Sequence, residues 1–332
     1  MARQPVRWGI LATGTIAHKF AEGLSAVPEA TLAAVGSRSR ERADAFAAWY
    51  GAARAHGSYA ALAQDPEVDV VYVATPHSLH RDNTLRCLEA GKAVLCEKPL
   101  ALNAREAREM ADVARANGQF LMEAMWSRFL PSFAQLRQWL HGGAIGEPRM
   151  VLADFGFRSD IETESRLFNP EFGGGGLLDV GVYAVSFASM VFGEAPEAVA
   201  GRADVGETGV DEQAAAVLAY SGGRLASVAC AIRTTTPQEA WVLGTEGRIH
   251  LPGPFWCGTE AVLHRDGKTP ETAHCPFEGN GYNWEAAAVG ECLRAGRREH
   301  ALMPLEESIA IMETMDGLRE QWGVRYAADS GK

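Results

Sequence analysis

Residues 93–100 read A-V-L-C-E-K-P-L and mark the carboxyl end of a buried strand. Four apolar residues follow a Gly-Lys turn, which is typical of a strand inside a parallel sheet. Glu97 and Lys98 come next, and Pro99 ends the strand because it lacks a backbone N–H. Since ligands of open α/β sheets bind outside the carboxyl ends of the strands, we expect the Lys98 ammonium beside a bound ligand. The alternative is a lysine whose charged end only reaches solvent.

Strand and helix patterns alternate on both sides of this stretch, up to about residue 124. The other predicted strands of this half cover residues 6–11, 31–36, 68–74 and 120–124. The alternation predicts right-handed crossovers and a doubly wound parallel sheet, the Rossmann type of α/β fold. After residue 125, runs of alternating apolar and small or polar residues indicate an antiparallel sheet with one covered face. We therefore expect a Rossmann domain at residues 1–125 and an α+β domain at residues 126–332.

Composition and charge exclude several classes of function. The 332 residues carry a net charge of −11 without a run of five like charges, which argues against nucleic-acid or membrane-surface partners. Six scattered cysteines without a C-x-x-C pair indicate reduced thiols. His77 and His80 lack a second ligand pair, so we expect no metal site. No apolar run approaches 18 residues and no signal region precedes the first strand, which predicts a cytoplasmic protein.

Residues 12–17 (A-T-G-T-I-A) occupy the position of a dinucleotide-binding loop. In the pattern G-x-G-x-x-G/A, Ala12 stands at the first glycine and Gly14 at the second. Gly14 lets the backbone approach a pyrophosphate, and the N–H groups that open the next helix suit phosphate oxygens. The alternative is an ordinary strand–helix turn. The loop residues predicted to contact the nucleotide are Ala12, Thr13, Gly14, Thr15 and Ile16.

The end of the second strand indicates which nucleotide binds. An NAD-binding fold usually has Asp or Glu here, to bond the ribose 2′-hydroxyl. This chain has Ser37 and Arg38 instead, with Arg42 one helical turn further on. A hydroxyl and two guanidinium groups suit a 2′-phosphate, which arginine can bind bidentately. We therefore expect NADP as the cofactor; the alternative is a solvated basic helix start.

Residues 173–183 read G-G-G-G-L-L-D-V-G-V-Y and predict a helix in the second domain. The glycines leave room for another group to approach the start of this helix closely. Asp179 and Tyr183 are four residues apart and therefore share one helix face. A carboxylate and a phenol placed in this way can hold one substrate hydroxyl between them. The alternative is a first-turn charge and a core aromatic side chain.

These motifs together resemble the Gfo/Idh/MocA oxidoreductases, over essentially the whole chain. The motifs are the 12–17 loop, Thr75-Pro76-His77, Glu97-Lys98-Pro99 and the helix with Asp179 and Tyr183. Three further cues resemble the branch of dimeric dihydrodiol dehydrogenases and NADP-dependent D-xylose dehydrogenases: residues 8–11 (W-G-I-L), 122–129 (M-E-A-M-W-S-R-F) and 207–211 (E-T-G-V-D). The resemblance implies an open, mostly antiparallel sheet in the C-terminal domain and a homodimer formed through it.

The resemblance also implies a reaction and its residues. It implies NADP-linked oxidation of a hydroxyl on a cyclic sugar, polyol or trans-dihydrodiol, or the reverse reduction. Tyr183 would be the acid/base, Lys98 the lysine of the E-K-P motif, and Asp179 the carboxylate that orients the substrate. Further residues predicted to bind the cofactor are Thr75, Pro76, His77, His80, Glu97 and Lys98.

The sequence also suggests residues of the substrate pocket. Trp126 and Arg128 follow the last predicted Rossmann strand and are expected to line the pocket, or else to be boundary residues. Arg166 lies near where some sugar reductases have Trp-Arg, so the lining there stays open.

The predicted chemistry is consistent with the residues themselves. Alcohol oxidation needs a base for the hydroxyl proton while hydride leaves the carbon. The pKa of a free tyrosine is about 10, and an ammonium such as that of Lys98 nearby lowers the pKa of Tyr183. Two alternatives stay open: a regulator that binds NADP without turnover, and a redox-cycling glycosidase that never releases its cofactor.

Overall fold

The computed structural model describes residues 4–330, which form two compact units. The first unit comprises the chain up to Ala101, Arg105–Phe129 and Glu278–Ser308; the second comprises Leu102–Ala104, Leu130–Phe277 and the chain from Ile309 onward. The chain thus returns to the first unit through α8 (Tyr282–Arg294), whereas we expected one boundary near residue 125. The functional division at residues 1–125 and 126–332 stays a prediction.

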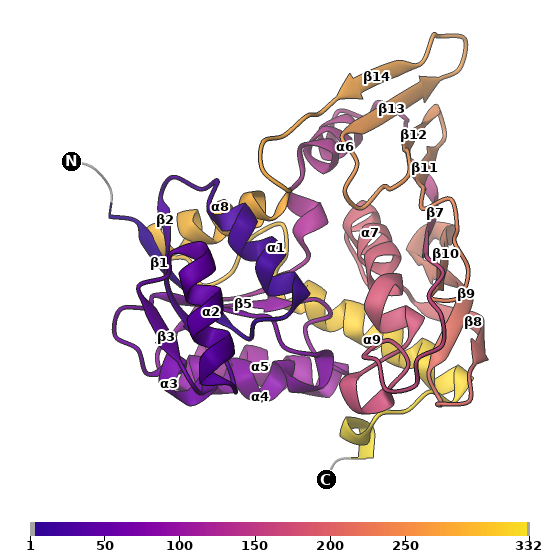
Figure 1. Cartoon of the computed structure of the whole chain (residues 1–332). Coiled ribbons are helices and arrows are strands. Elements are labelled where there is room, and N and C mark those ends of the chain that lie inside the picture. Colours follow the sequence, from indigo (N-terminus) through magenta and orange to yellow (C-terminus); the bar gives the residue numbers. More distant parts are fainter. Residues whose placement is uncertain (1–3, 331–332) are drawn as a thin grey trace. The chain divides into compact units, whose positions relative to one another are not determined.

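The first unit contains a six-stranded parallel sheet in the order β3-β2-β1-β4-β5-β6 (Figure 1). Its strands are β1 (Val6–Leu11), β2 (Ala30–Gly36), β3 (Arg54–His56), β4 (Val70–Val73), β5 (Ala93–Glu97) and β6 (Leu121–Ala124). The strand order reverses between β1 and β4, which is the place where this fold type binds dinucleotides. The predicted doubly wound sheet is confirmed. The short, partly exposed edge strand β3 was not predicted.

Helices connect these strands, and local sequence explains where several of them begin and end. They are α1 (Thr15–Leu24), α2 (Arg40–Tyr50), α3 (Tyr59–Ala63), α4 (His80–Glu89) and α5 (Ala104–Ala116). The Ser39 hydroxyl accepts a hydrogen bond from the Arg42 amide at 3.3 Å and so begins α2. Gly51 (φ 74°) ends α2 in the left-handed conformation that glycine adopts readily.

The second unit contains an eight-stranded sheet in the order β14-β13-β12-β11-β7-β10-β9-β8. Its strands are β7 (Pro148–Gly156), β8 (Ala198–Val205), β9 (Asp211–Tyr220), β10 (Arg224–Ala231), β11 (Ala240–Gly244), β12 (Gly247–Leu251), β13 (Glu260–Arg265) and β14 (Glu271–His274). Neighbouring strands are antiparallel except β7 and β10, which are parallel. The predicted second, mostly antiparallel sheet is therefore confirmed, and β13 and β14 extend it beyond the prediction.

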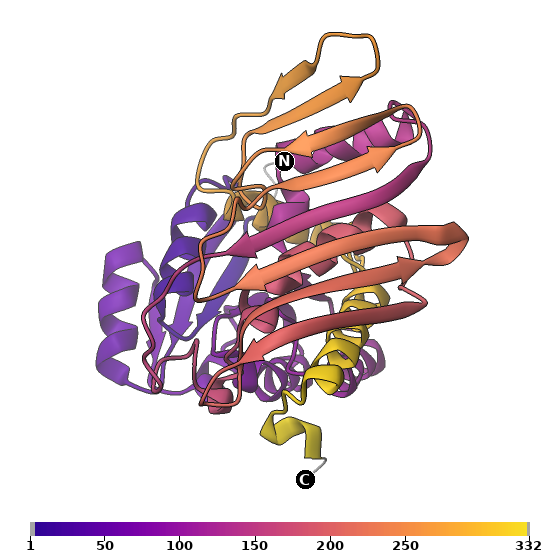
Figure 2. The same ribbon diagram turned by 90° about the vertical axis from the view of Figure 1, so that its right-hand side faces the viewer.

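Helices α6 (Pro131–His141) and α7 (Val182–Phe192) pack on one face of this sheet. The part of α9 (Leu305–Trp322) that belongs to the second unit lies on the same face, where Leu318 and Trp322 meet β9 and β10. Figure 2 looks onto the opposite face, where no helix of the described chain lies. Burial alternates along β9 accordingly, since Ala216 and Leu218 are buried while Val217 is 45% exposed. Met150 and Leu225 are also partly exposed. The open face thus presents apolar side chains.

One helical stretch, Pro170–Phe192, is long and apolar enough to cross a membrane by length and composition. The sequence did not predict such a stretch, because no unbroken apolar run approaches 18 residues. However, 89% of its apolar window is buried inside the protein, as in the core helix of a soluble protein.

Candidate active site

A cavity of about 330 Å³ lies beside the 12–14 loop, beyond the carboxyl ends of β1 and β2. Its lining residues are Ala12, Thr13, Gly14, Ser37, Arg38, Ser39, Arg42, Tyr59, Ala74 and Pro76. The fold thus brings the predicted nucleotide loop and the predicted phosphate-binding side chains around one space. Thr15 and Ile16 begin α1 directly behind the loop.

The backbone of the loop fits a dinucleotide despite the missing first glycine. Ala12 adopts φ 86°, the left-handed conformation that the first glycine of the pattern would supply. Its amide donates to the carbonyl of Gly36 at 2.9 Å, which fixes the turn against β2. A Cβ on Gly14 would meet nothing within 4 Å, so there is open room in front of the first turn of α1. A helix N-terminus facing open room is a ready site for a phosphate.

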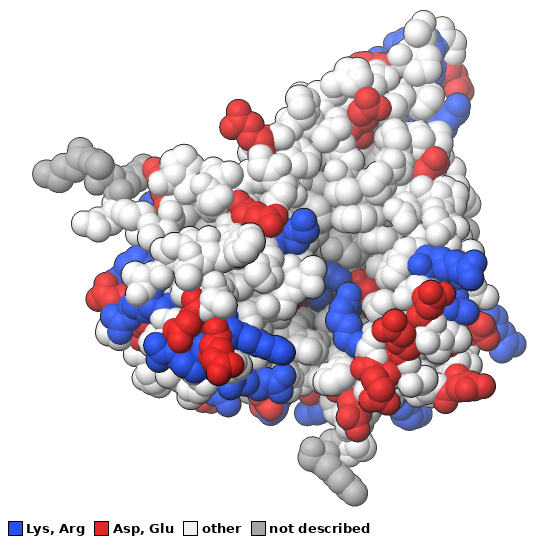
Figure 3. All heavy atoms as spheres, viewed as in Figure 1, with Lys and Arg blue, Asp and Glu red and all other residues white. Residues whose placement is uncertain are grey.

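Two basic side chains, Arg38 and Arg42, are among the lining residues of this cavity. Arg38 and Arg42 are exposed, and neither forms an ion pair within the described part of the chain. Arg40, between them, is paired with Asp44 at 2.9 Å. Figure 3 shows basic side chains, with acidic ones among them, over the region of α2. Tyr59, at the start of α3, was missed because a single aromatic residue after a capping serine has no nucleotide-binding signature.

The E-K-P turn at the end of β5 is held by neighbouring strands and turns. The Glu97 carboxylate accepts a short hydrogen bond from the Tyr72 hydroxyl of β4 and another from the Lys98 amide at 3.1 Å. These contacts fix the backbone from which the Lys98 side chain extends. The Glu97 side chain is buried. These contacts do not test the predicted contact of Glu97 with a cofactor, which stays a prediction.

His80 also supports this turn. The side chain is fully buried, with Nδ1 2.8 Å from the Pro99 carbonyl and Nε2 2.9 Å from the Thr75 carbonyl. Burial lowers the pKa of His80 to about 4, against the two carbonyl groups, which raise it because they can only accept hydrogen bonds. These contacts favour a supporting role for His80 over the predicted contact with the cofactor. The His77 ring lies 5.6 Å from that of His80.

Two buried acids nearby were not predicted. Burial raises the pKa of Glu123 on β6 to about 7, and Glu123 accepts a hydrogen bond from the Leu100 amide. Burial and the charge of Glu97 raise the pKa of Glu285 on α8 well above its usual value. Neither acid could be recognised as a site residue from the sequence, because each lies in an otherwise apolar or helical pattern.

In the second unit, Asp179 lies in a turn of π-helix, Leu177–Gly181, that leads directly into α7. The sequence predicted a regular helix here; the added width of a π-turn has no local signature, and such turns are frequent at functional sites. Asp179 is 4% exposed and accepts a hydrogen bond from Arg166 at 2.8 Å. The Arg166 guanidinium thus helps to direct the Asp179 carboxylate, while the pocket lining around residues 166–168 stays open.

Tyr183 lies in the first turn of α7 within an aromatic cluster. Its ring centroid is 5.4 Å from that of Phe155 and 5.9 Å from that of Trp256. Phe155 and Trp256 are stacked, with centroids 4.7 Å apart and planes 7° apart. Both residues were missed, since Phe155 reads as a strand residue and Trp256 as a loop aromatic. The cluster places a flat apolar surface next to the phenol.

Trp126 and Arg128 lie in a buried 3₁₀ turn, Trp126–Phe129, of the first unit. Arg128 is 1% exposed, donates to the Leu302 carbonyl and forms an ion pair with Glu307 at 2.7 Å. Trp126 stacks on Tyr282 with centroids 4.5 Å apart. These contacts agree with the boundary role that the sequence left open, and the pocket-lining role stays a prediction.

Two family models match the chain. One, described as an oxidoreductase family with an NAD-binding Rossmann fold, matches residues 6–125, and the Gfo/Idh/MocA C-terminal domain model matches residues 133–250. The chain belongs to the Gfo/Idh/MocA family of oxidoreductases. The resemblance seen in the sequence is thereby confirmed, and the Rossmann unit is of the NAD(P)-binding type.

Individual relatives support this family assignment. The trans-1,2-dihydrobenzene-1,2-diol dehydrogenase of Mus musculus is 42% identical and covers 98% of this chain and 99% of its own. The crystal structure of an aldose-aldose oxidoreductase from Caulobacter crescentus matches with a TM-score of 0.88 at 25% identity, over 99% of both chains. KijD10, a 3-ketoreductase from Actinomadura kijaniata solved with NADP and TDP-benzene, matches with a TM-score of 0.83 at 26% identity, over 96% of this chain and 98% of its own. This Gfo/Idh/MocA protein is therefore an oxidoreductase that acts on CH–OH groups.

Proposed function

We propose that this protein transfers a hydride between NADP and a hydroxyl-bearing carbon of a trans-dihydrodiol, cyclic sugar or polyol. The observation that carries the proposal is the phenol of Tyr183 beside the stacked rings of Phe155 and Trp256. A flat apolar surface suits the ring of a cyclic diol, and the phenol supplies the proton-transfer group. The dihydrodiol dehydrogenase relatives agree with this substrate class.

Three side chains would share the work at the reacting carbon. Tyr183, as the phenolate, would take the hydroxyl proton, and in the reverse direction it would return it. The Lys98 ammonium would favour the phenolate by its positive charge. Asp179, directed by Arg166, would hold the substrate hydroxyl toward the phenol. The nicotinamide, when bound, supplies the hydride acceptor.

Cofactor choice follows from the basic end of the cavity. We expect Arg38→Ala to weaken NADP binding by about 1.5–3 kcal/mol and to leave NAD binding nearly unchanged, since only NADP carries the 2′-phosphate. Calorimetric titration of both cofactors measures the difference. Arg40→Ala is the control, because Arg40 is already paired with Asp44. Equal affinities of the wild type for NADP and NAD would refute the proposed preference.

The open sheet face of the second unit suits a homodimer. Exposed apolar residues such as Val217 and Leu225 would be covered if two such faces paired. We expect light scattering at micromolar concentration to give twice the chain mass of 35.7 kDa. Val217→Lys together with Leu225→Lys should shift the mass toward the monomer. A wild-type mass near 35.7 kDa would contradict the dimer.

The proposed location is the cytoplasm. All six cysteines are free thiols, and four of them are buried. Unpaired thiols suit a reducing compartment.

A screen of NADP reduction tests the proposed activity. The substrates are trans-dihydrodiols, D-xylose, D-glucose, inositols and 1,5-anhydrofructose. We expect NADPH to accumulate with at least one cyclic diol or sugar. Tight NADP binding without turnover on any of them would favour the regulator instead, and cofactor that co-purifies and is never released would favour the redox-cycling glycosidase.

A further inference from the structure

Asp211 begins β9 and ends the sequence E-T-G-V-D, to which the proposed chemistry gives no role. The side chain is fully buried. Its Oδ2 accepts a hydrogen bond from the amide of Leu177 at 2.6 Å. Leu177 is the first residue of the π-turn that contains Asp179 and leads to Tyr183. A carboxylate from a distant strand therefore occupies the start of the helix that carries the proposed chemistry.

The glycine run before this helix is shaped around the same carboxyl group. A Cβ on Gly175, where φ is 114°, would lie 2.4 Å from Asp211 Oδ1. A Cβ on Gly176 would lie 3.4 Å from Oδ2. The sequence predicted that some group approaches this helix start closely, and that group is Asp211. Any side chain at Gly175 would push the carboxyl group away.

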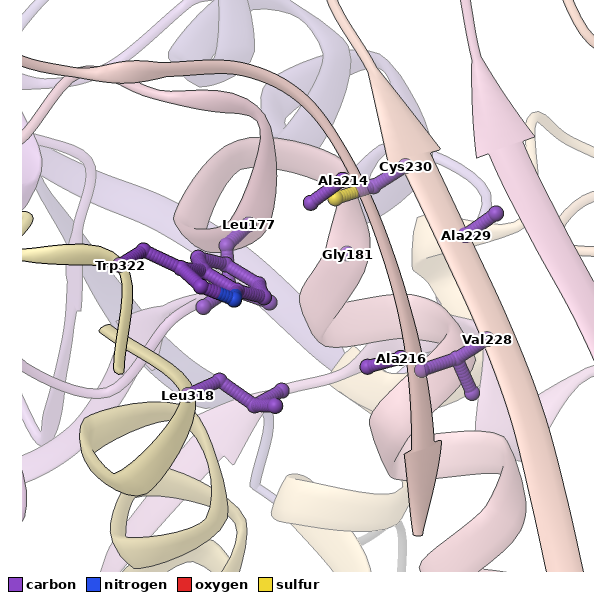
Figure 4. Close-up of a pocket in the computed structure, with 9 residues that line it drawn as sticks. All are labelled: Leu177, Gly181, Ala214, Ala216, Val228, Ala229, Cys230, Leu318 and Trp322. Atoms are coloured by element: carbon purple, nitrogen blue, oxygen red, sulfur yellow. The ribbon is translucent and has the colours of Figure 1, made fainter. Parts of the chain in front are cut away.

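Neighbouring elements hold the same region. The Tyr326 hydroxyl donates to the Gly174 carbonyl at 2.5 Å. Leu177 and Gly181 of the π-turn also line a small apolar pocket together with Cys230, and Leu318 and Trp322 of α9 help to close it (Figure 4). Its volume of about 10 Å³ is that of one water molecule at most, so it cannot hold a substrate.

We propose that Asp211 is a positioning residue, whose carboxyl oxygen holds the first turn of the catalytic helix in the π conformation that presents Asp179 and Tyr183. The first amides of a helix have no acceptor within the helix, so they need one from elsewhere. A π-turn persists only where the surroundings over-determine it. The inference rests on the proposed function only in taking Asp179 and Tyr183 as the groups that act on substrate.

A neutral hydrogen-bond acceptor can replace the Asp211 carboxylate in the proposed positioning role. Burial raises the pKa of Asp211 to about 7, so near neutral pH the group holds Leu177 in both charged and uncharged forms. The charged or titratable groups around it are Cys230 on β10, Arg319 on α9 and Tyr326. The carbonyl oxygen of asparagine can accept the same hydrogen bond.

Hydrogen exchange measured by mass spectrometry on the full-length protein tests the proposal. In Asp211→Ala we expect the amides of residues 174–185 to exchange about tenfold faster or more, while peptides of the Rossmann sheet keep wild-type rates. Asp211→Asn should keep nearly the wild-type exchange. Asp204→Ala, which removes an exposed carboxylate from β8, is the control and should change nothing in this segment.

Kinetics on the best diol substrate provide the second readout. Turnover should fall about 10–100-fold in Asp211→Ala with the KM for NADP unchanged, and Asp211→Asn should recover most of it. Unchanged exchange in Asp211→Ala, or exchange in Asp211→Asn as fast as in Asp211→Ala, would overturn the proposal. If Asp211→Ala does not fold, Asp211→Asn decides alone, and faster exchange than wild type at residues 174–185 overturns it. Exchange needs no substrate, so an inactive wild type would count against the proposed function only.

Discussion

Turnover of the Tyr183→Phe variant is expected to fall by about 10²–10⁴-fold, the usual contribution of general acid–base catalysis. The substitution removes the hydroxyl that exchanges the substrate proton. It keeps the ring that packs against Phe155 and Trp256, so the fold of the second unit should survive. NADP binding should be nearly unaffected, because the cavity proposed to hold the phosphates of the cofactor is lined by residues of the first unit. Steady-state kinetics with the best diol measure the loss.

A control variant at another buried tyrosine tests whether the loss of turnover is specific to Tyr183. Tyr220→Phe removes another buried hydroxyl of the second unit, from a ring that packs on Phe192, and should leave turnover nearly unchanged. Near-normal turnover in Tyr183→Phe would show that the proton is transferred elsewhere. Equal losses in the two variants would attribute the effect to general destabilisation.

Replacing Lys98 with methionine is expected to have the second-largest effect. In the proposed mechanism the Lys98 ammonium lowers the pKa of the Tyr183 phenol, so the variant should form less phenolate at neutral pH. Turnover near pH 7 should fall by about 10²-fold or more, and the residual activity should appear only at higher pH. Because the two groups act as one unit, the double variant should be little worse than the less active single variant.

Lys92→Met is the matched control. The Lys92 ammonium donates to the carbonyls of Asp65 and Val68, so its loss should lower stability without moving the pH profile. A pH profile of Lys98→Met that coincides with that of the wild type would refute the assigned role of Lys98. Additive losses in the double variant would show that Lys98 and Tyr183 act independently.

Elements with a strong hydrophobic period could be predicted from the sequence alone. The strand Val6–Leu11 has the predicted bounds, and β2 begins one residue earlier than predicted. The strands β3 (Arg54–His56), β13 and β14 could not be predicted so readily, because they are short or partly exposed and their pairing depends on distant partners. The return of residues 278–308 to the first unit has no local signature either.

In the candidate site, too, residues in local motifs could be predicted from the sequence, and residues with distant partners could not. The loop around Gly14 and the basic pair Arg38 and Arg42 could be placed from local motifs, and the fold gathers them around one cavity. The Asp211 acceptor could not be identified, because it lies 34 residues from Leu177 along the chain. The sequence indicated only that the glycines leave room for another group near the start of the helix. The burial of Arg128 was likewise invisible locally, since its partner Glu307 is 179 residues away.

In the proposed reaction, hydride passes directly from a substrate CH–OH carbon to the nicotinamide of NADP. This transfer can be followed with a trans-1,2-dihydrobenzene-1,2-diol labelled with deuterium on both hydroxyl-bearing carbons. After incubation with the enzyme and NADP, mass spectrometry of the released cofactor should find one deuterium in each NADPH, in amounts equal to the oxidised product. Bound cofactor that stays oxidised, or product formed without deuterated NADPH in solution, would contradict the account.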